Sequence, residues 1–190
     1  STMLAGSVGW GDAVVLIPYA IYKRTRDTKV LQENYPMMKK WVNYLELRAK
    51  ARPDNLSEDE VSTFEDYTID TGVDYGEWCE PGVNNLMNMR TPQTKVSTAY
   101  FAYSSRLLSE IAGILDEKED ADYFRNVAEN ARQAFRSCAT VGGEIVSERQ
   151  ADYVRALHFN LLNPEESKTA AAKLNELVVN AGYHLNTGFL

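Results

Sequence analysis

The side chains best suited to chemistry lie outside the periodic apolar runs of this sequence. Gly9-Trp10-Gly11-Asp12 stands just before an apolar run, and Tyr75-Gly76-Glu77-Trp78-Cys79-Glu80 lies in an irregular acidic stretch. Aromatic faces pack against the apolar faces of sugar rings, and carboxylates accept hydrogen bonds from hydroxyls. Paired carboxylates also supply the acid and the base or nucleophile of glycoside hydrolysis. The candidate ligand-binding residues are Trp10, Asp12, Glu77, Trp78, Glu80, Gln150 and His184.

Each of these residues also has a structural interpretation. Asp is a preferred helix N-cap, so local chemistry favours capping over ligand binding for Asp12. By residue type alone, Trp78 is more typical of a core than of a binding surface. Glu80, and to a lesser degree Glu77, fits a solvated acidic loop. His184 is more typical of a structural histidine than of a catalytic base.

The composition is that of an ordinary globular domain and argues against several classes of partner. The 190 residues are 44% hydrophobic and 25% charged, with a net charge of −7. Nucleic acids and anionic membranes both favour positive charge, and no apolar run is long enough to span a bilayer. No Cys/His cluster has the spacing of a metal site. We therefore expect no nucleic acid, membrane, metal or cofactor, and thiols rather than a disulfide at Cys79 and Cys138.

Apolar residues recur at helical spacing through most of the chain. Asn163-Pro164-Glu165-Glu166 is a strong helix start, with an Asn cap, Pro at the first position and Glu at the third. Val141-Gly142-Gly143-Glu144 indicates a tight turn or a short β-hairpin. Pro36 marks a point where the second helix could divide. The predicted helices cover approximately residues 12–24, 28–51, 97–115, 120–138, 148–162 and 163–182.

A long irregular stretch, residues 52–92, separates the second and third predicted helices. Between residues 54 and 89 it contains ten Asp or Glu and no Lys or Arg. A loop this long inside a compact domain is usually functional or disordered. The aromatic and glycine-rich part around Trp78 fits disorder poorly, which favours a functional loop.

The predicted helices alternate in character along the chain. The first, third and fifth are apolar or rich in tyrosine and small residues, whereas the second, fourth and sixth are amphipathic. This alternation is typical of an inner and an outer helical layer, here built from three αα-hairpins. The candidate residues precede the inner helices, or follow the last helix where another inner helix would begin. In a toroid of hairpins these positions share one end, so we expect the candidates to converge there.

Six short motifs follow one another along the chain. They are Gly9-Trp10-Gly11-Asp12-Ala13, Asn34-Tyr35-Pro36-Met37-Met38, Trp41-Val42-Asn43-Tyr44-Leu45, Tyr75-Gly76-Glu77-Trp78, Val96-Ser97-Thr98-Ala99-Tyr100 and His184-Leu185-Asn186-Thr187-Gly188-Phe189. In order and spacing this set resembles the catalytic domain of bacterial α-L-rhamnosidases of glycoside hydrolase family 78. The resemblance runs from about residue 8 to residue 190.

The resemblance implies an all-α fold, an (α/α)6 six-hairpin toroid, of which residues 1–190 form about three hairpins. It also implies an active-site loop at 52–92, hydrolysis of terminal α-L-rhamnosyl linkages with inversion, and no obligatory metal. Trp10, Asp12 and Trp78 match positions that resemble substrate-binding ones, and Glu77 replaces the family's more usual Asp.

The family's proton-transfer residues are expected outside this chain. The general acid belongs to an Arg-Glu-type motif upstream, and the general base to a Trp-Glu-type motif downstream; neither motif is present here. We therefore expect an internal segment of a longer glycosidase that contributes sugar-binding residues and is inactive in isolation. The alternatives are a non-catalytic helical domain that binds carbohydrate or protein, and another six-hairpin glycosidase. We also expect self-association of the isolated segment, and a periplasmic or extracellular rather than cytoplasmic parent.

Overall fold

The computed structural model describes residues 6–51, 66–82 and 91–190. Within these residues the chain is helical, with one short two-stranded antiparallel sheet. The predicted stretch 52–92 falls partly outside the described residues, and its described part, 66–82, contains neither helix nor strand. The elements are α1 (Ala13–Thr25), α2 (Lys29–Lys50), α5 (Thr94–Ile114), α6 (Lys118–Ala139), β1 (Thr140–Val141), β2 (Glu144–Ile145), α7 (Gln150–His158) and α8 (Pro164–Asn180).

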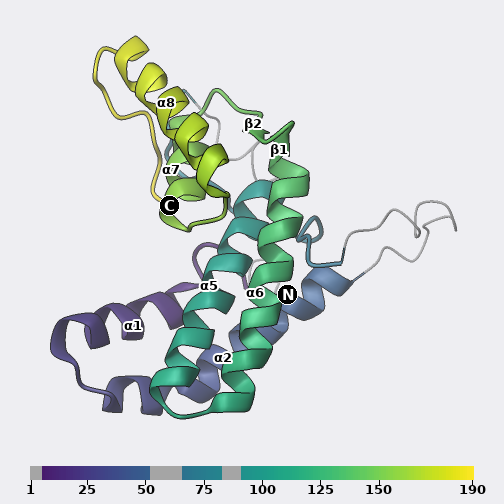
Figure 1. Ribbon diagram of the computed structural model, residues 1–190, viewed down its shortest axis with the longest axis vertical. Coiled ribbons are helices and arrows are strands. Elements are labelled where there is room, and N and C mark those ends of the chain that lie inside the picture. Colours follow the sequence, from purple (N-terminus) through teal and green to yellow (C-terminus); the bar gives the residue numbers. More distant parts are fainter. Residues whose placement is uncertain (1–5, 52–65, 83–90) are drawn as a thin grey trace, which may run out of the picture.

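The helices pair as three successive αα-hairpins, as the sequence predicts, and α5 lies at their centre. α1 packs on α2, α5 on α6 and α7 on α8, and α5 also contacts α1, α2 and α7 (Figure 1). α5 is buried around most of its circumference, including small polar positions such as Ser104 and Ser105. Small side chains there let the neighbouring helices approach closely, so α5 is the scaffold on which the other hairpins are placed.

Local signals fix several boundaries. Asn163 accepts a hydrogen bond from the Glu166 amide, and the Glu166 side chain accepts one from the Asn163 amide, so the predicted capping box is confirmed. The Gly142-Gly143 turn joins β1 to β2, with both glycines at positive φ, which confirms the predicted hairpin.

Two expectations about helix boundaries are wrong. α2 runs unbroken through Pro36, which is exposed on its surface. The helix expected over 148–162 covers only Gln150–His158, because Asn160 adopts a left-handed conformation with φ of 57° that ends it.

The apolar composition of the first helix suggests that it is buried on every side. In the structure one side of this helix is exposed. Within α1 only Val15 and Pro18 are buried, and Ile17 and Ile21 keep 57% and 43% of their surface exposed. The side of α1 turned away from α2 and α5 is therefore an uncovered apolar surface in this segment of chain.

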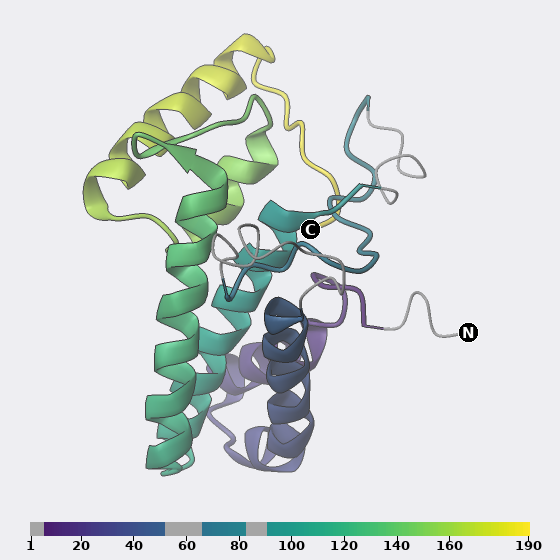
Figure 2. The same ribbon diagram turned by 90° about the vertical axis from the view of Figure 1, so that its right-hand side faces the viewer.

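Three segments far apart in the sequence meet at one side of the molecule. The turn at 6–12, the loop at 66–82 and the C-terminal stretch at 183–190 lie side by side there (Figure 2). The start of α7 is tied to the same group, because Arg149 bonds to Glu80 and Gln150 bonds to Asn186. The expected convergence of these positions at one end is therefore present.

Candidate functional site

Four aromatic rings form a cluster where the three segments meet. Trp10 stacks on Phe189 with ring centroids 5.0 Å apart and an interplanar angle of 3°. Tyr75 packs edge-on against both Trp10 and Trp78, at 5.9 and 5.5 Å. The Phe189 amide also donates to the Trp78 carbonyl at 2.7 Å. Trp10 and Phe189 remain 36% and 70% exposed, so both residues are accessible from solvent.

Asp12 lies beneath this cluster and is fully buried. One carboxylate oxygen accepts from Trp41 Nε1 at 2.9 Å and from Ser104 Oγ at 2.5 Å, and the other accepts from the Gly9 amide at 2.7 Å. Burial raises the pKa of Asp12, although these three hydrogen bonds oppose the shift. The carboxylate thus fastens the Trp10 turn to α2 and α5.

The prediction that the Asp12 side chain caps the first helix is wrong. Asp12 occupies the N-cap position of α1, but its backbone is already helical and its side chain makes no capping hydrogen bond. The donors on Trp41 and Ser104 compete successfully for the carboxylate, and neither is visible from the local sequence.

Glu77 is also fully buried, in an ion pair with Arg155. Its other oxygen accepts the Leu190 amide at 3.1 Å. Burial raises the pKa of Glu77, and the charge of Arg155 opposes that shift. A Cβ at Gly188 would lie 2.3 Å from the Trp78 carbonyl and 2.8 Å from Glu77 Oε1, so only glycine lets the C-terminal stretch approach this closely.

Glu80 is 5% exposed and pairs with Arg149, whose Nε lies 3.1 Å from Glu80 Oε1 and whose Nη2 bonds to Oε2. The solvated-loop interpretation therefore does not hold for Glu80, nor for the buried Glu77. Two arginines in and before α7 supply the countercharges, and the sequence pattern did not predict the role of Arg155.

Gln150 and His184 contribute differently. The buried Gln150 amide donates to the His184 carbonyl at 3.2 Å and accepts from the Asn186 amide at 3.0 Å. Gln150 therefore holds the backbone that follows α8. The His184 side chain is exposed and lies beside that backbone.

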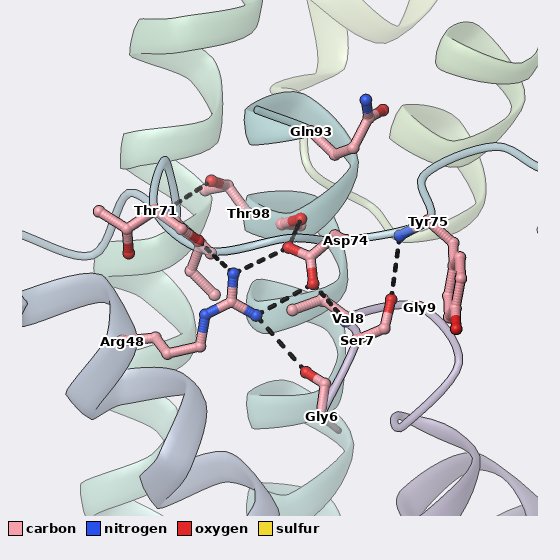
Figure 3. A network of polar contacts seen from close by, with 12 residues as sticks. Gly6, Ser7, Val8, Gly9, Arg48, Thr71, Asp74, Tyr75, Gln93 and Thr98 are labelled. Atoms are coloured by element: carbon pink, nitrogen blue, oxygen red, sulfur yellow. Dashed lines mark hydrogen bonds and ion pairs between the residues drawn. The ribbon is translucent and has the colours of Figure 1, made fainter. Parts of the chain in front are cut away.

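A third ion pair with a buried carboxylate, between Arg48 and Asp74, lies under the same segments (Figure 3). Asp74 is 4% exposed and joins α2, α5 and the turn at 6–9. Neither residue was among the predicted site residues. The only hint in the sequence was the position of Asp74 directly before Tyr75, because long-range pairs leave no periodic pattern.

Three carboxylates lie near the aromatic cluster, and protein donors hold both oxygens of each. Each oxygen of Asp12, Glu77 and Glu80 accepts at least one hydrogen bond from the protein. Such carboxylates are well suited to positioning neighbouring groups. Within the described residues no group of three or more His, Cys, Asp or Glu could hold a metal ion, and no helix there is long and apolar enough to cross a membrane.

A family model described as the bacterial alpha-L-rhamnosidase 6 hairpin glycosidase domain matches residues 2–190. The chain belongs to this family. The resemblance seen in the motifs and the all-α hairpin fold that it implied are therefore both confirmed. The chain contributes its hairpins to a six-hairpin glycosidase fold.

Curated members of the rhamnosidase family are similar to this chain along nearly its whole length. An alpha-L-rhamnosidase from Formosa agariphila is 34% identical over 187 residues, which are 97% of this chain and 18% of that protein. An alpha-L-rhamnosidase from Alteromonas sp. is 33% identical over 197 residues, covering 97% of this chain and 19% of that protein. The chain thus spans less than a fifth of the length of these relatives.

Solved structures of alpha-L-rhamnosidases have the same fold over this segment. That of Streptomyces avermitilis, complexed with L-rhamnose, matches with a TM-score of 0.77 and 29% identity, covering 97% of this chain and 16% of that one. That of Aspergillus terreus matches with a TM-score of 0.73 and 26% identity, covering 94% of this chain and 20% of that one.

Proposed function

We propose that the full-length protein is a glycosidase that hydrolyses terminal α-L-rhamnosyl linkages with inversion, and that this segment supplies part of its sugar-binding surface. The observation that carries the proposal is the similarity of nearly the whole chain to curated alpha-L-rhamnosidases. The aromatic cluster supports it, because partly exposed aromatic side chains suit the apolar face of a sugar ring.

In this account the segment binds sugar and the proton-transfer pair lies elsewhere in the parent. An inverting glycosidase holds a water between two carboxyl groups roughly 6.5–9.5 Å apart, one acting as acid and the other as base. Asp12, Glu77 and Glu80 are each held by protein donors on both oxygens. We assign them to positioning, and Trp10 and Trp78 to contact with the sugar ring.

The test is the anomer released first by the full-length protein. Proton NMR of an aryl α-L-rhamnoside digest, recorded within the first turnovers, should show β-L-rhamnose before mutarotation produces the mixture. Release of the α-anomer first would contradict inversion. Cleavage of aryl α-glycosides of other sugars in preference to the rhamnoside would favour another six-hairpin glycosidase.

A non-catalytic carbohydrate-binding role is the second candidate. It rests on the bonding of the three carboxylates, because none presents an oxygen without a protein donor and the segment alone therefore offers no proton-transfer pair. Binding of L-rhamnose by the full-length protein, measured by calorimetry, without cleavage of any aryl glycoside would support this candidate over the enzyme.

We further propose that the segment, expressed alone, self-associates through the uncovered side of α1. Ile17 and Ile21 on that side are 57% and 43% exposed, and contiguous apolar patches are seldom left open in monomers. Light scattering should report oligomers for the 190-residue chain and a shift toward monomer after Ile17→Lys and Ile21→Lys. A monodisperse monomer before substitution would contradict the proposal.

A further inference from the structure

The Arg48–Asp74 pair is the most heavily bonded polar junction near the aromatic cluster among the described residues. Arg48 donates from Nη1 to Asp74 Oδ1 at 3.0 Å and from Nη2 to Asp74 Oδ2 at 2.9 Å, a two-point contact. Ser97 Oγ donates to the same carboxylate at 2.7 Å, and the Val8 amide does so at 2.8 Å. Asp74 therefore accepts four hydrogen bonds while almost fully buried.

The guanidinium of Arg48 extends this junction to both backbone segments that carry the rings. It donates to the Gly6 carbonyl at 3.5 Å and to the Thr71 carbonyl. A Cβ at Gly72 would lie 2.9 Å from Arg48 Nη2, so glycine leaves room for the guanidinium there. The two segments are also joined directly, because the Tyr75 amide donates to Ser7 Oγ at 3.0 Å (Figure 3).

The rings of the site lie within a few residues of these bonds. Trp10 follows Val8 by two positions, and Tyr75 follows Asp74 directly. The edge-on contact between Trp10 and Tyr75, at 5.9 Å, spans the same two segments. A bidentate arginine–carboxylate pair fixes direction as well as distance, and a buried pair of this kind limits the relative movement of the segments that it joins.

We propose that Arg48 and Asp74 are positioning residues for sugar binding. Their ion pair sets the spacing between the turn that carries Trp10 and the turn that carries Tyr75 and Trp78. They act through these two turns and do not contact the sugar. This inference rests on the proposed rhamnosidase function and extends it to two residues that lie beneath the site.

The test compares Asp74→Asn and Arg48→Lys in the full-length protein. Arg48→Lys keeps the positive charge but loses the two-point contact with Asp74. This variant provides the test if Asp74→Asn fails to fold. Each variant should raise the KM for an aryl α-L-rhamnoside about tenfold with kcat changed less than about threefold, because ground-state and transition-state binding are lost together.

The matched control is Glu166→Gln, which disrupts another two-point arginine–carboxylate contact. Arg136 Nε and Nη2 lie 2.9 and 2.5 Å from the Glu166 oxygens, at the start of α8. Glu166→Gln should leave KM unchanged, so a KM increase restricted to the Arg48 and Asp74 variants separates positioning from a general loss of stability.

Hydrogen–deuterium exchange provides a readout that needs no substrate. Peptides covering residues 6–12 and 72–80 should exchange faster in Asp74→Asn and Arg48→Lys than in wild type or in Glu166→Gln. Unchanged exchange there, or faster exchange with an unchanged KM, would overturn the inference. A wild-type protein that does not cleave the rhamnoside would overturn the proposed function and the role in sugar binding together, and the exchange data would still decide whether the pair holds the two turns.

Discussion

Trp10 and Phe189 stack face to face with their ring centroids 5.0 Å apart, although they lie near opposite ends of the sequence. Through this contact the C-terminal stretch, residues 183–190, packs against the turn at residues 6–12 and forms one side of the candidate site. The Phe189 amide bond to the Trp78 carbonyl, at 2.7 Å, ties the same stretch to the acidic loop. Phe189, which was not among the predicted site residues, therefore belongs to the candidate sugar-binding surface.

Phe189→Leu removes the ring while keeping apolar volume. We expect the KM for an aryl α-L-rhamnoside to rise about tenfold, and the free energy of unfolding to fall by only about 1 kcal/mol, the usual worth of an aromatic pair. Tyr183→Leu is the matched control, since Tyr183 is an exposed aromatic in the same stretch. Steady-state kinetics on the full-length variants checks this, and a wild-type KM for Phe189→Leu would remove Phe189 from the site.

Asp12→Asn tests the anchoring of the Trp10 turn. The Asn oxygen can still accept from Trp41 and Ser104, but its amide then faces the Gly9 N–H, another donor. We expect a loss of about 1–3 kcal/mol in the free energy of unfolding, with reduced rhamnoside hydrolysis. Asp27→Asn, in the exposed turn between α1 and α2, is the control. A large loss of activity with unchanged stability would instead indicate direct ligand contact by Asp12.

Local patterns predicted the helices well because their determinants are local. Apolar periodicity located the six described helices, and Asn163, Pro164 and Glu166 located the start of α8. The expectation that Pro36 could divide the second helix was wrong, because Pro36 lies on the exposed side of α2 and the helix continues through it. The exposure of Ile17 depends on what packs against α1, which the composition of α1 does not encode.

The sequence predicted that the candidate residues converge, but it did not predict the bonds that their side chains make. The candidates do converge at one end, because hairpin topology brings the starts of inner helices together. The roles of Asp12 and Glu77 depend on Trp41, Ser104 and Arg155, which are distant in sequence and lie within helical patterns. Buried partners of this kind follow from tertiary packing and cannot be inferred from spacing.

The Glu77–Arg155 pair should show strong coupling in a double-mutant cycle. Arg155→Met leaves the Glu77 carboxylate buried without its countercharge, so we expect a loss of about 3–5 kcal/mol in the free energy of unfolding. Combining it with Glu77→Gln removes that charge while keeping an acceptor for the Leu190 amide. The double variant should be more stable than Arg155→Met alone, and simple additivity of the two losses would contradict a coupled buried pair.

Glu166 should make the stability of the contact between α6 and α8 depend on pH. Hydrogen bonds from Arg136 hold the pKa of Glu166 below its ordinary value of 4.5. The stabilisation is therefore complete above that value, and it is lost as the pH falls through the lowered pKa of the folded state. Glu166→Gln should cost about 2 kcal/mol at neutral pH.

The cost of Glu166→Gln should shrink under acidic conditions, because protonation then weakens the pair in the wild type as well. Thermal unfolding at about pH 7 and about pH 4 measures this difference. Equal destabilisation at both values would contradict the assignment of the lowered pKa to the Arg136 pair.

The most direct test of the account compares the 190-residue segment with its full-length parent on an aryl α-L-rhamnoside, following the released phenol. The account predicts activity in the parent alone, with the proton-transfer carboxylates outside this segment. Activity in the segment would contradict it, because a complete acid–base pair would then lie within these residues. No activity in either protein would contradict the proposed rhamnosidase function.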